Sequence, residues 1–524
     1  MQIDVSGDSL IGEISTSTAG APNSGFNPTH MAISPSKSRL FVAAAASIFP
    51  GGVDAIASFS PVFQTTQATG FGAVSMIGLP SLTGQSSSIA SISEAGNLVT
   101  VTLSSPITNA VAPTSIAING VFIPGCVLPC NAGAYNGTFA TTLISGTMVT
   151  YVNPMTGLAA ASGGTASIPN QPVFLNSTEN NNMYVANYNS NSVATINTIS
   201  NVVTNTAIVG TNPVSLAETP NALKLYVANQ GSNTVSSLNP IDLTPNTLTG
   251  FTGVNPIWLV ARGDSQKVYV LTEGDGQLVT IDVGTDTVTS SLPVGAGANF
   301  IFLDPTLNRL YITNPITQTV YVFSDTGGVV GGVVSDIPSL LATISFNTGS
   351  TACPGGGCMP VSVTALLDGS RFYVATYQTS TACPAGSGVT GACVIPRLTV
   401  FNANTLSLMY PSTPTLTLLV SAPFAAGQSA VPPIASCATA PLYPALYSPS
   451  TTRFRVFTEA SEDSTRVYVS MCDAGSIAVI NTTDSNSNSS TPLPADSVVI
   501  DIPAAPEANS ATALQNPIFL LMGQ

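Results

Sequence analysis

Short runs of alternating apolar and polar residues recur along this chain, and the clearest of them repeat as a unit. Residues 171–295 contain three copies of a Tyr-Val segment followed by a second apolar segment of the Val-x-x-Ile-Asp type. The tyrosines of these copies and the next one along the chain are Tyr184, Tyr226, Tyr269 and Tyr311, so successive positions differ by 42, 43 and 42. Alternation over four to eight residues is typical of half-buried β-strands. The pattern predicts an all-β chain built from a repeated unit.

Each repeat is predicted to form four strands, A to D. Strand A follows a proline, strand B contains the Tyr-Val segment, strand C contains the second apolar segment, and strand D lies outermost. Repeats of this length with four short strands are typical of β-propellers, in which each repeat is one blade. Seven B strands can be counted, and the sequence therefore predicts a seven-bladed β-propeller. These strands lie at Phe41, Tyr184, Tyr226, Tyr269, Tyr311, Tyr373 and Tyr468.

The regular spacing is broken once, between the first and second repeats. Phe41 and Tyr184 are 143 positions apart, about 100 more than one repeat. Residues 81–168 supply most of this excess and are predicted to form an inserted small β module between blades 1 and 2, with strands at 98–103, 137–144 and 148–151. The predicted domains are thus 1–80, an N-terminal closing strand with blade 1; 81–168, the inserted module; and 169–524, blades 2–7 with a C-terminal closing strand.

The two ends of the sequence both match parts of a repeat. Residues 3–14 align without gaps on residues 281–292, the end of one strand C and the strand D that follows it. Residues 516–520, Asn-Pro-Ile-Phe-Leu, match the start of a further strand A. We expect the two ends to close the propeller ring. The alternative is pairing with a neighbouring molecule, because an unpaired strand edge recruits partners.

Charge and hydropathy exclude several classes of partner. Charged residues make up only 7% of the chain, and 11 basic against 25 acidic residues give a net charge of -14. We therefore expect no binding to nucleic acid or to anionic lipid. No apolar run approaches the ~18 residues of a membrane span. The first residues lack the basic and apolar regions of a signal peptide, and we interpret the sequence as a form from which a signal has been removed.

The eight cysteines indicate disulfides. Their even number and their close spacing within loops are typical of oxidised proteins, which predicts an extracellular, periplasmic or cell-surface location. The candidates are Cys126, Cys130, Cys353, Cys358, Cys383, Cys393, Cys437 and Cys472. Cys437 and Cys472 flank the first two strands of blade 7, and the other three pairs would close local loops. Zinc binding is the alternative for the two closest pairs, but the chain contains a single histidine.

Nearly all of the irregular segments are predicted to lie at one end of the propeller. In a four-stranded blade, the B–C and D–A connections leave at the same end. The module at 81–168 and all of the cysteine-containing segments are connections of these two kinds. Long loops held on a rigid scaffold are a common binding surface, and we expect a protein or a glycan to bind there. In the alternative interpretation, the disulfides only protect the loops from proteases.

Candidate catalytic and metal-binding residues are few. His30 follows Pro28 in strand A of blade 1 at a position that other blades fill with Phe174 or Trp258, which favours a packing role. No catalytic residue and no bound cofactor are assigned. Glu273 and Asp275 lie in one B–C loop and are the candidate calcium ligands. An ordinary solvated loop is the alternative.

The segments Tyr184-Val-Ala-Asn187, Tyr226-Val-Ala-Asn229 and Tyr311-Ile-Thr-Asn314 resemble the YVTN-type β-propeller repeat family of bacterial secreted and archaeal surface-layer proteins. The resemblance covers residues 27–60 and 171–503. It implies a secreted or cell-surface scaffold without catalytic activity, and assembly into a surface layer or fibre through the terminal strands. The repeats are also similar to lactonase-like propellers, whose catalytic residues match no positions here. That similarity implies the alternative function, a hydrolase acting at the central channel.

Overall fold

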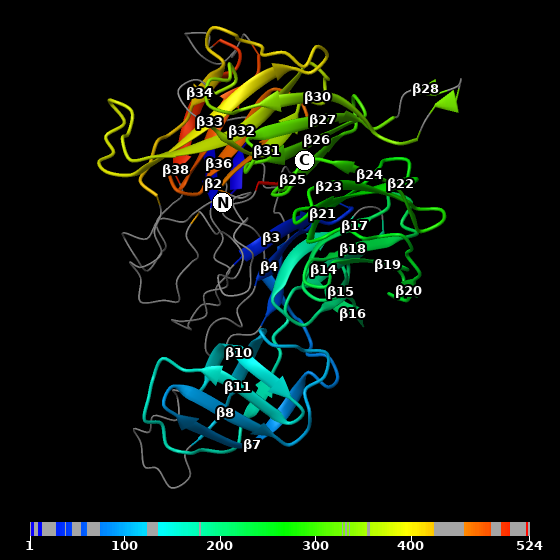
Figure 1. Cartoon of the computed structure of the whole chain (residues 1–524), viewed down its shortest axis with the longest axis vertical. Helices are drawn as coiled ribbons and strands as arrows, with labels where there is room; N and C mark the ends of the chain where they lie inside the picture. The colour runs from blue at the N-terminus through cyan, green and yellow to red at the C-terminus, as the bar shows by residue number, and fades with distance from the viewer. Residues whose placement is uncertain are drawn as a thin grey trace.

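The computed structural model places most of the chain in β-strands (Figure 1). It describes residues 2–4, 9–12, 28–36, 38–44, 54–59, 74–122, 135–177, 180–326, 329–330, 333–334, 336–353, 357–423, 437, 455–483, 494–503 and 520–521. All regular secondary structure in these ranges is strand, as the alternating sequence pattern predicts. Nowhere in them is there a helix with the length and apolarity needed to cross a membrane.

Seven four-stranded antiparallel sheets contain most of the strands in the described ranges, and each sheet is built from consecutive strands in chain order, apart from a short hairpin within the fifth. Repeated sheets of this kind fit a β-propeller. The sheets are β3 (Pro28–Ile33), β4 (Leu40–Ala44), β5 (Ala55–Phe59) and β6 (Val74–Gly78); β13 (Pro172–Asn176), β14 (Asn182–Asn187), β15 (Ser192–Asn197) and β16 (Val202–Ile208); β17 (Pro213–Glu218), β18 (Leu225–Asn229), β19 (Thr234–Leu238) and β20 (Pro245–Asn246); β21 (Pro256–Ala261), β22 (Lys267–Thr272), β23 (Gln277–Asp282) and β24 (Thr287–Pro293); β25 (Phe300–Asp304), β26 (Arg309–Asn314), β27 (Thr319–Ser324) and β30 (Ser339–Ser345); β31 (Met359–Ala365), β32 (Arg371–Ser380), β33 (Cys393–Asn402) and β34 (Thr415–Thr417); and β35 (Val456–Ala460), β36 (Arg466–Met471), β37 (Ser476–Asn481) and β38 (Ser497–Pro503).

Burial differs between the strands of a sheet, and the sequence pattern differs with it. The first strands of successive sheets pack on one another, from β3 on β13 through to β31 on β35. The second strands are therefore covered on both faces, and β18 and β22 are buried at every residue. The fourth strands face solvent on one side, so β24 alternates between partly buried and exposed residues. Two covered faces favour the continuous apolar runs of the second strands.

Buried carboxylates join neighbouring sheets. The hydroxyl of Tyr226 donates to Oδ1 of Asp286 at 2.5 Å, and Asp286 lies in the next sheet, between β23 and β24. The Tyr269 hydroxyl donates likewise to Asp325, which lies between β27 and β30. The Tyr373 hydroxyl donates at 2.5 Å to Asp496, which lies just before β38. The side chains of these three aspartates are at most 7% exposed. Part of the scarce charge of this chain therefore serves to hold the sheets together.

The segment between β6 and β13 forms a separate closed barrel. Its strands follow the order β10-β11-β8-β7-β12-β9, and its buried side chains make a core of their own. Figure 1 shows the barrel at one extremity of the molecule. The bounds are β7 (Ser86–Ala95), β8 (Leu98–Leu103), β9 (Ser115–Asn119), β10 (Gly137–Ser145), β11 (Met148–Val152) and β12 (Thr165–Ser167).

Two short hairpins stand outside these sheets. Strands β1 (Gln2–Asp4) and β2 (Ser9–Gly12) pair with each other, and so do β28 (Val329–Val330) and β29 (Val333–Val334). The first hairpin pairs Ile3 with Leu10 and has a register shift just before Ile3. Strands β23 and β24 pair Ile281 with Val288 and have the same shift just before Ile281. The sequence match of residues 3–14 to this strand pair is thus accompanied by the same pairing register, although the hairpin remains a separate sheet.

Candidate functional site

The first strands of the seven sheets place one residue each at the same register. Four of these residues are aromatic and contact one another across the sheets. The ring centroids of Phe174 and Trp258 are 5.6 Å apart, those of Trp258 and Phe300 5.2 Å, and those of Phe300 and Phe457 5.7 Å. All four side chains are buried. Aromatic rings from four sheets therefore fill the space between the first strands at this level.

His30 belongs to this aromatic group. Its ring stacks on Phe174 with centroids 4.1 Å apart. The backbone N–H of Leu175 donates to its Nδ1 at 3.2 Å, and Thr458 N–H donates in the same way to Ser362 Oγ at 3.2 Å. A first strand leaves N–H groups unpaired on its inner edge, and these side chains of the preceding sheet accept from them. The geometry gives His30 a role in packing and hydrogen bonding.

Two residues further along, four of the seven first strands have a side chain that water reaches in part. Asn176, Val260, Phe302 and Glu459 share this register and are partly exposed. Protein atoms still crowd the carboxyl of Glu459, and burial raises the pKa of this group to about 8. A carboxyl that stays protonated near neutral pH can donate a proton or a hydrogen bond. Sequence reasoning missed Glu459; its position two residues after the aromatic residue of a first strand was the available signal.

Three disulfides lie in connections that leave the sheets at one end, which we call the cystine end. Cys353–Cys358 lies between β30 and β31, and Cys383–Cys393 closes the tip of the long β32–β33 hairpin. Cys437 precedes β35 and is bonded to Cys472, which follows β36. Antiparallel strands place all of these connections at the same end as the barrel. Cys126 and Cys130 lie outside the described residues.

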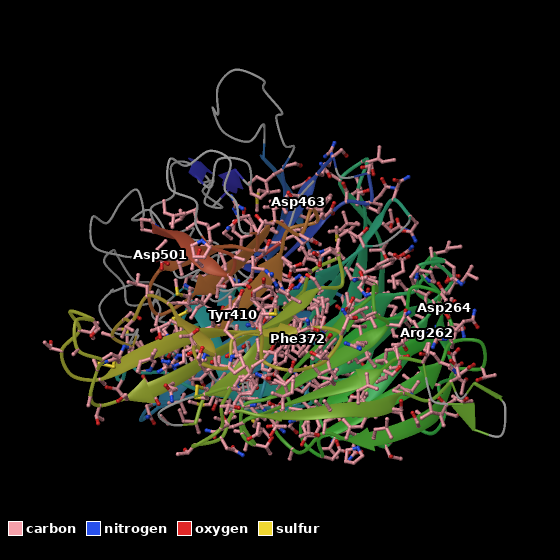
Figure 2. The ribbon with its side chains drawn as sticks, turned by 90° about the horizontal axis from the view of Figure 1, so that it is seen from above. Arg262, Asp264, Phe372, Tyr410, Asp463 and Asp501 are labelled. Atoms are coloured by element: carbon pink, nitrogen blue, oxygen red, sulfur yellow. A yellow bond between two sulfur atoms is a disulfide. The ribbon has the colours of Figure 1, made fainter. Side chains whose placement is uncertain are left out.

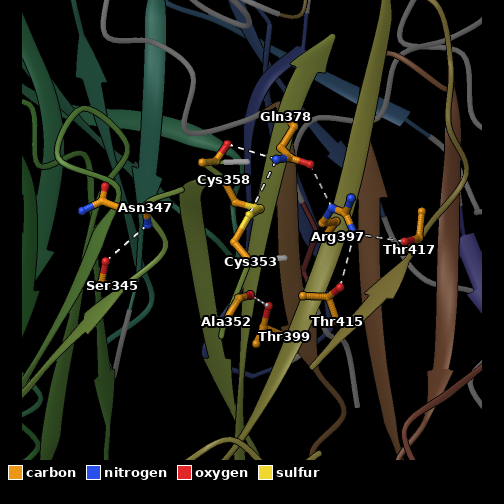
Figure 3. The surroundings of a disulfide bond; sticks show 11 residues. Ser345, Asn347, Ala352, Cys353, Cys358, Gln378, Arg397, Thr399, Thr415 and Thr417 are labelled. Atoms are coloured by element: carbon orange, nitrogen blue, oxygen red, sulfur yellow. Dashed lines mark hydrogen bonds between the residues drawn. A yellow bond between two sulfur atoms is a disulfide. The ribbon is translucent and has the colours of Figure 1, made fainter. Parts of the chain in front are cut away.

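Polar side chains fix the base of the β32–β33 hairpin beside one disulfide (Figure 3). Gln378 Nε2 donates to Gly357 O at 3.3 Å and lies 3.7 Å from Cys353 Sγ. Arg397 Nε donates to Gln378 Oε1 at 3.1 Å. The hairpin and the Cys353–Cys358 loop are thus held together, which makes this part of the cystine end rigid.

The barrel is also held rigidly at this end, by the side chain of Asn189 in the β14–β15 turn. Its Oδ1 accepts from Thr114 Oγ1 at 2.6 Å and from Ser115 N at 2.7 Å. Its Nδ2 donates to Ser115 O and Pro169 O, both at 3.0 Å. Asn189 is only 1% exposed. Three of these buried hydrogen bonds reach the barrel at Thr114 and Ser115, and the fourth reaches Pro169 just before β13, so one side chain fixes the barrel to the sheet.

Replacing Asn189 by alanine is expected to loosen the barrel. Because the change leaves buried N–H and C=O groups of the barrel unpaired, it should cost about 2–3 kcal/mol at this junction. Limited proteolysis should then cut the two junctions near residues 80 and 169 faster than in the wild type. The control is Thr102→Ala, an exposed barrel position, which should leave the cutting rate unchanged. Equal rates in N189A and wild type would show that the junction does not depend on Asn189.

The two candidate calcium ligands lie differently in their loop. Glu273 is buried, whereas Asp275 is exposed. Asp275 Oδ1 accepts from Thr272 Oγ1 at 2.5 Å and from Val254 N at 3.2 Å, which ties the loop together. Within the described ranges, no group of three or more His, Cys, Asp and Glu side chains is arranged to hold a metal ion. The calcium site stays a prediction.

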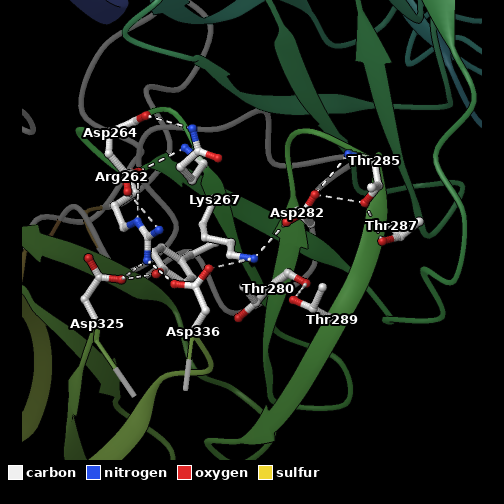
Figure 4. Close-up of polar contacts among 12 residues, drawn as sticks. Arg262, Asp264, Lys267, Thr280, Asp282, Thr285, Thr287, Thr289, Asp325 and Asp336 are labelled. Atoms are coloured by element: carbon white, nitrogen blue, oxygen red, sulfur yellow. Dashed lines mark hydrogen bonds and ion pairs between the residues drawn. The ribbon is translucent and has the colours of Figure 1, made fainter. Parts of the chain in front are cut away.

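A charged pocket lies at the opposite end, between the β21–β24 sheet and the sheet of β25–β27 and β30 (Figures 2 and 4). Its volume is about 340 Å³. Arg262 contacts Asp264 at 2.9 Å and Asp336 at 3.0 Å, and Lys267 contacts Asp336 at 3.1 Å. The hydrogen bond from Lys267 lowers the pKa of Asp282 to about 2. Asp264, Asp282 and Asp336 are each paired with Arg262 or Lys267. The ion pairs to Asp336 join the two sheets.

Comparisons with known proteins give no family. No family model matches the chain, and no curated protein matches it. Among solved structures, hydrazine synthase of Kuenenia stuttgartiensis is similar at 15% identity with a TM-score of 0.40, covering 62% of this chain and 83% of that one. A protein from Lactobacillus plantarum is similar at 15% identity with a TM-score of 0.35, covering 62% of this chain and 78% of that one.

Proposed function

We propose that this chain is a seven-bladed β-propeller with an inserted barrel that works outside the cytoplasm as a non-catalytic binding scaffold. Its partner, a protein or a glycan of the cell surface, binds at the cystine end. The repeat resemblance and the disulfides favour a YVTN-type secreted protein. The observation that carries the proposal is the fixed geometry of this end, where three disulfides and the four hydrogen bonds of Asn189 hold the loops and the barrel.

Two further observations support a scaffold over an enzyme. The aromatic contacts from Phe174 to Phe457 fill the space between the first strands, where a substrate channel would run. The carboxylates of the charged pocket at the opposite end, Asp264 and Asp336, are already paired with Arg262 or Lys267. A preorganised loop surface binds with a small loss of conformational entropy, and rigid loops therefore suit recognition.

Binding of the fluorescently labelled protein to cells of the producing organism tests the proposal. We expect saturable binding, and we expect it to be lost when residues 385–390 at the tip of the β32–β33 hairpin are replaced by a Gly-Ser linker. The control replaces the β28–β29 hairpin at the other end and should bind like the wild type. Pretreating the cells with protease or with periodate separates a protein partner from a glycan. Absence of saturable binding, or equal losses in both variants, would overturn the proposal.

One observation favours a second function, hydrolysis of a lactone. Glu459 lies on a first strand, partly exposed, and its raised pKa suits a general acid. Opening a lactone with water releases one carboxylic acid, and the proton it loses can be titrated at constant pH. Acid release by the wild type that disappears in Glu459→Gln would replace the scaffold proposal with a hydrolase.

A further inference from the structure

For its length, the barrel exposes more large hydrophobic residues than the rest of the described chain. Of the 20 large hydrophobic residues that are exposed, seven lie in residues 81–168. Four of these gather on one face: Leu98 at 42%, Leu143 at 42%, Met148 at 39% and Val152 at 49% exposure. Patches of exposed aliphatic residues on a soluble protein commonly mark a contact with another macromolecule.

The strand register makes these residues neighbours. Leu98 of β8 pairs directly with Val152 of β11, and Met148 pairs with Thr102. Leu143 of β10 pairs with Thr150. The alternate residues of β8 and β11, such as Val99 and Tyr151, point into the barrel core and are fully buried. The outer face of the sheet β7-β8-β11-β10 is therefore a continuous surface of aliphatic and hydroxyl side chains, and we call it the barrel face.

The barrel face carries almost no charge on a strongly acidic protein. Glu94 is the only ionisable side chain of the acidic, basic or histidine kind in residues 81–168. Its Oε2 accepts from the N–H of Leu158 at 2.5 Å. The rest of the chain holds the other 24 of the 25 acidic residues and all 11 basic ones. A charged partner would lose hydration on the barrel face without gaining an ion pair.

We propose that the barrel face is a self-association surface, on which the barrel of a second copy packs sheet on sheet. A neutral aliphatic face is complementary to itself, and two sheets pack face to face at about 10 Å. The four strands of the face offer a glycan no freely exposed aromatic ring, because Tyr151 is fully buried and the half-buried Phe139 stacks on it with ring centroids 4.2 Å apart. The barrel lies at one extremity (Figure 1), so contact through it keeps the acidic sheets of two copies apart.

The size of the barrel face predicts a weak contact. Four strands spaced about 4.8 Å apart, with five or six residues at about 3.4 Å each, span about 300–400 Å². A stable interface buries about 800 Å² on each partner. We therefore expect reversible association that becomes strong only when many copies are held side by side, as on a cell surface.

Light scattering and sedimentation of the full chain over a range of concentrations test this surface. We expect the mean mass to rise above 53.2 kDa with concentration, and we expect added salt to preserve the association, because no charges are paired in it. In the double variant Leu98→Lys, Val152→Lys, two charges would be buried in the contact. We expect its association constant to fall by about tenfold or more. The matched control, Ile199→Lys with Ile241→Lys, changes residues that are 66% and 74% exposed outside the barrel and should associate like the wild type.

Two results would overturn the proposal. One is a wild-type protein that remains monomeric up to its solubility limit, and the other is a barrel-face variant that associates as strongly as the control. Circular dichroism of the variant verifies that it is folded. The cell-binding assay separates this inference from the proposed function, because the barrel-face variant should still bind cells through the hairpin tip at residues 385–390.

Discussion

Replacing Asp496 by alanine is expected to lower the free energy of unfolding by about 3–5 kcal/mol, because it removes one partner of a buried ion pair. The carboxylate is fully enclosed. Its Oδ1 accepts from Tyr373 at 2.5 Å, and its Oδ2 accepts from Tyr410 at 2.6 Å and lies 3.1 Å from Arg371 Nη1. The three partners belong to the β31–β34 sheet, whereas Asp496 precedes β38. The change removes the anionic partner of Arg371 and the acceptor of the Tyr373 and Tyr410 hydroxyl groups from the contact between two sheets.

The matched control is Asp264→Ala. Asp264 is also paired with an arginine, but its side chain is 50% exposed, and Arg262 keeps its contact with Asp336 at 3.0 Å. An exposed ion pair contributes about 0–1 kcal/mol. Urea titrations of wild type, D496A and D264A, followed by circular dichroism, measure the difference. If D496A and D264A unfolded at the same urea concentration, the sheets would not depend on the buried carboxylate.

The repeat could be predicted from sequence because its signal is local. Each B strand is marked by consecutive apolar residues around one aromatic residue, which is Phe41 in the first repeat and a tyrosine such as Tyr226 in the others, and two covered faces require such a run. The packing role of His30 could also be inferred from local sequence, because Pro28 marks the register of the first strand. The matching registers of β1–β2 and β23–β24 follow from a gap-free alignment of residues 3–14 on residues 281–292.

The contacts between sheets could not be predicted, because their partners are far apart in sequence. Tyr226 and Asp286 are 60 residues apart, and Tyr373 and Asp496 are 123 apart. The alternation of β8 and β11 indicates strands but does not show that the sheet closes into a barrel. The sequence around Glu459 indicates only its position on a first strand. Its raised pKa arises from burial in the folded protein, and no short segment of sequence contains that information.

Glu459 should make the protein less stable as the pH rises from about 4.5 to 8. An unfolded glutamate has a pKa of about 4.3, whereas burial raises the pKa of Glu459 to about 8 in the folded state. Between these values the folded protein binds a proton that the unfolded chain has released. The stabilisation from this group is complete below the lower pKa and is lost as the pH passes the upper one. A shift of one pKa unit corresponds to about 1.4 kcal/mol, so the loss should be about 3–5 kcal/mol.

Glutamine at position 459 keeps the shape of the protonated carboxyl and cannot ionise, so Glu459→Gln should match the wild type near pH 4.5 and exceed its stability by about 3–5 kcal/mol above pH 8. Urea titrations at half-unit steps of pH measure both curves. Glu462→Gln is the control, because Glu462 is exposed in the turn that follows β35, and its curve should follow that of the wild type. Parallel curves for E459Q and wild type across this range would mean that the carboxyl of Glu459 is already ionised at neutral pH, and a general acid could then no longer be assigned to it.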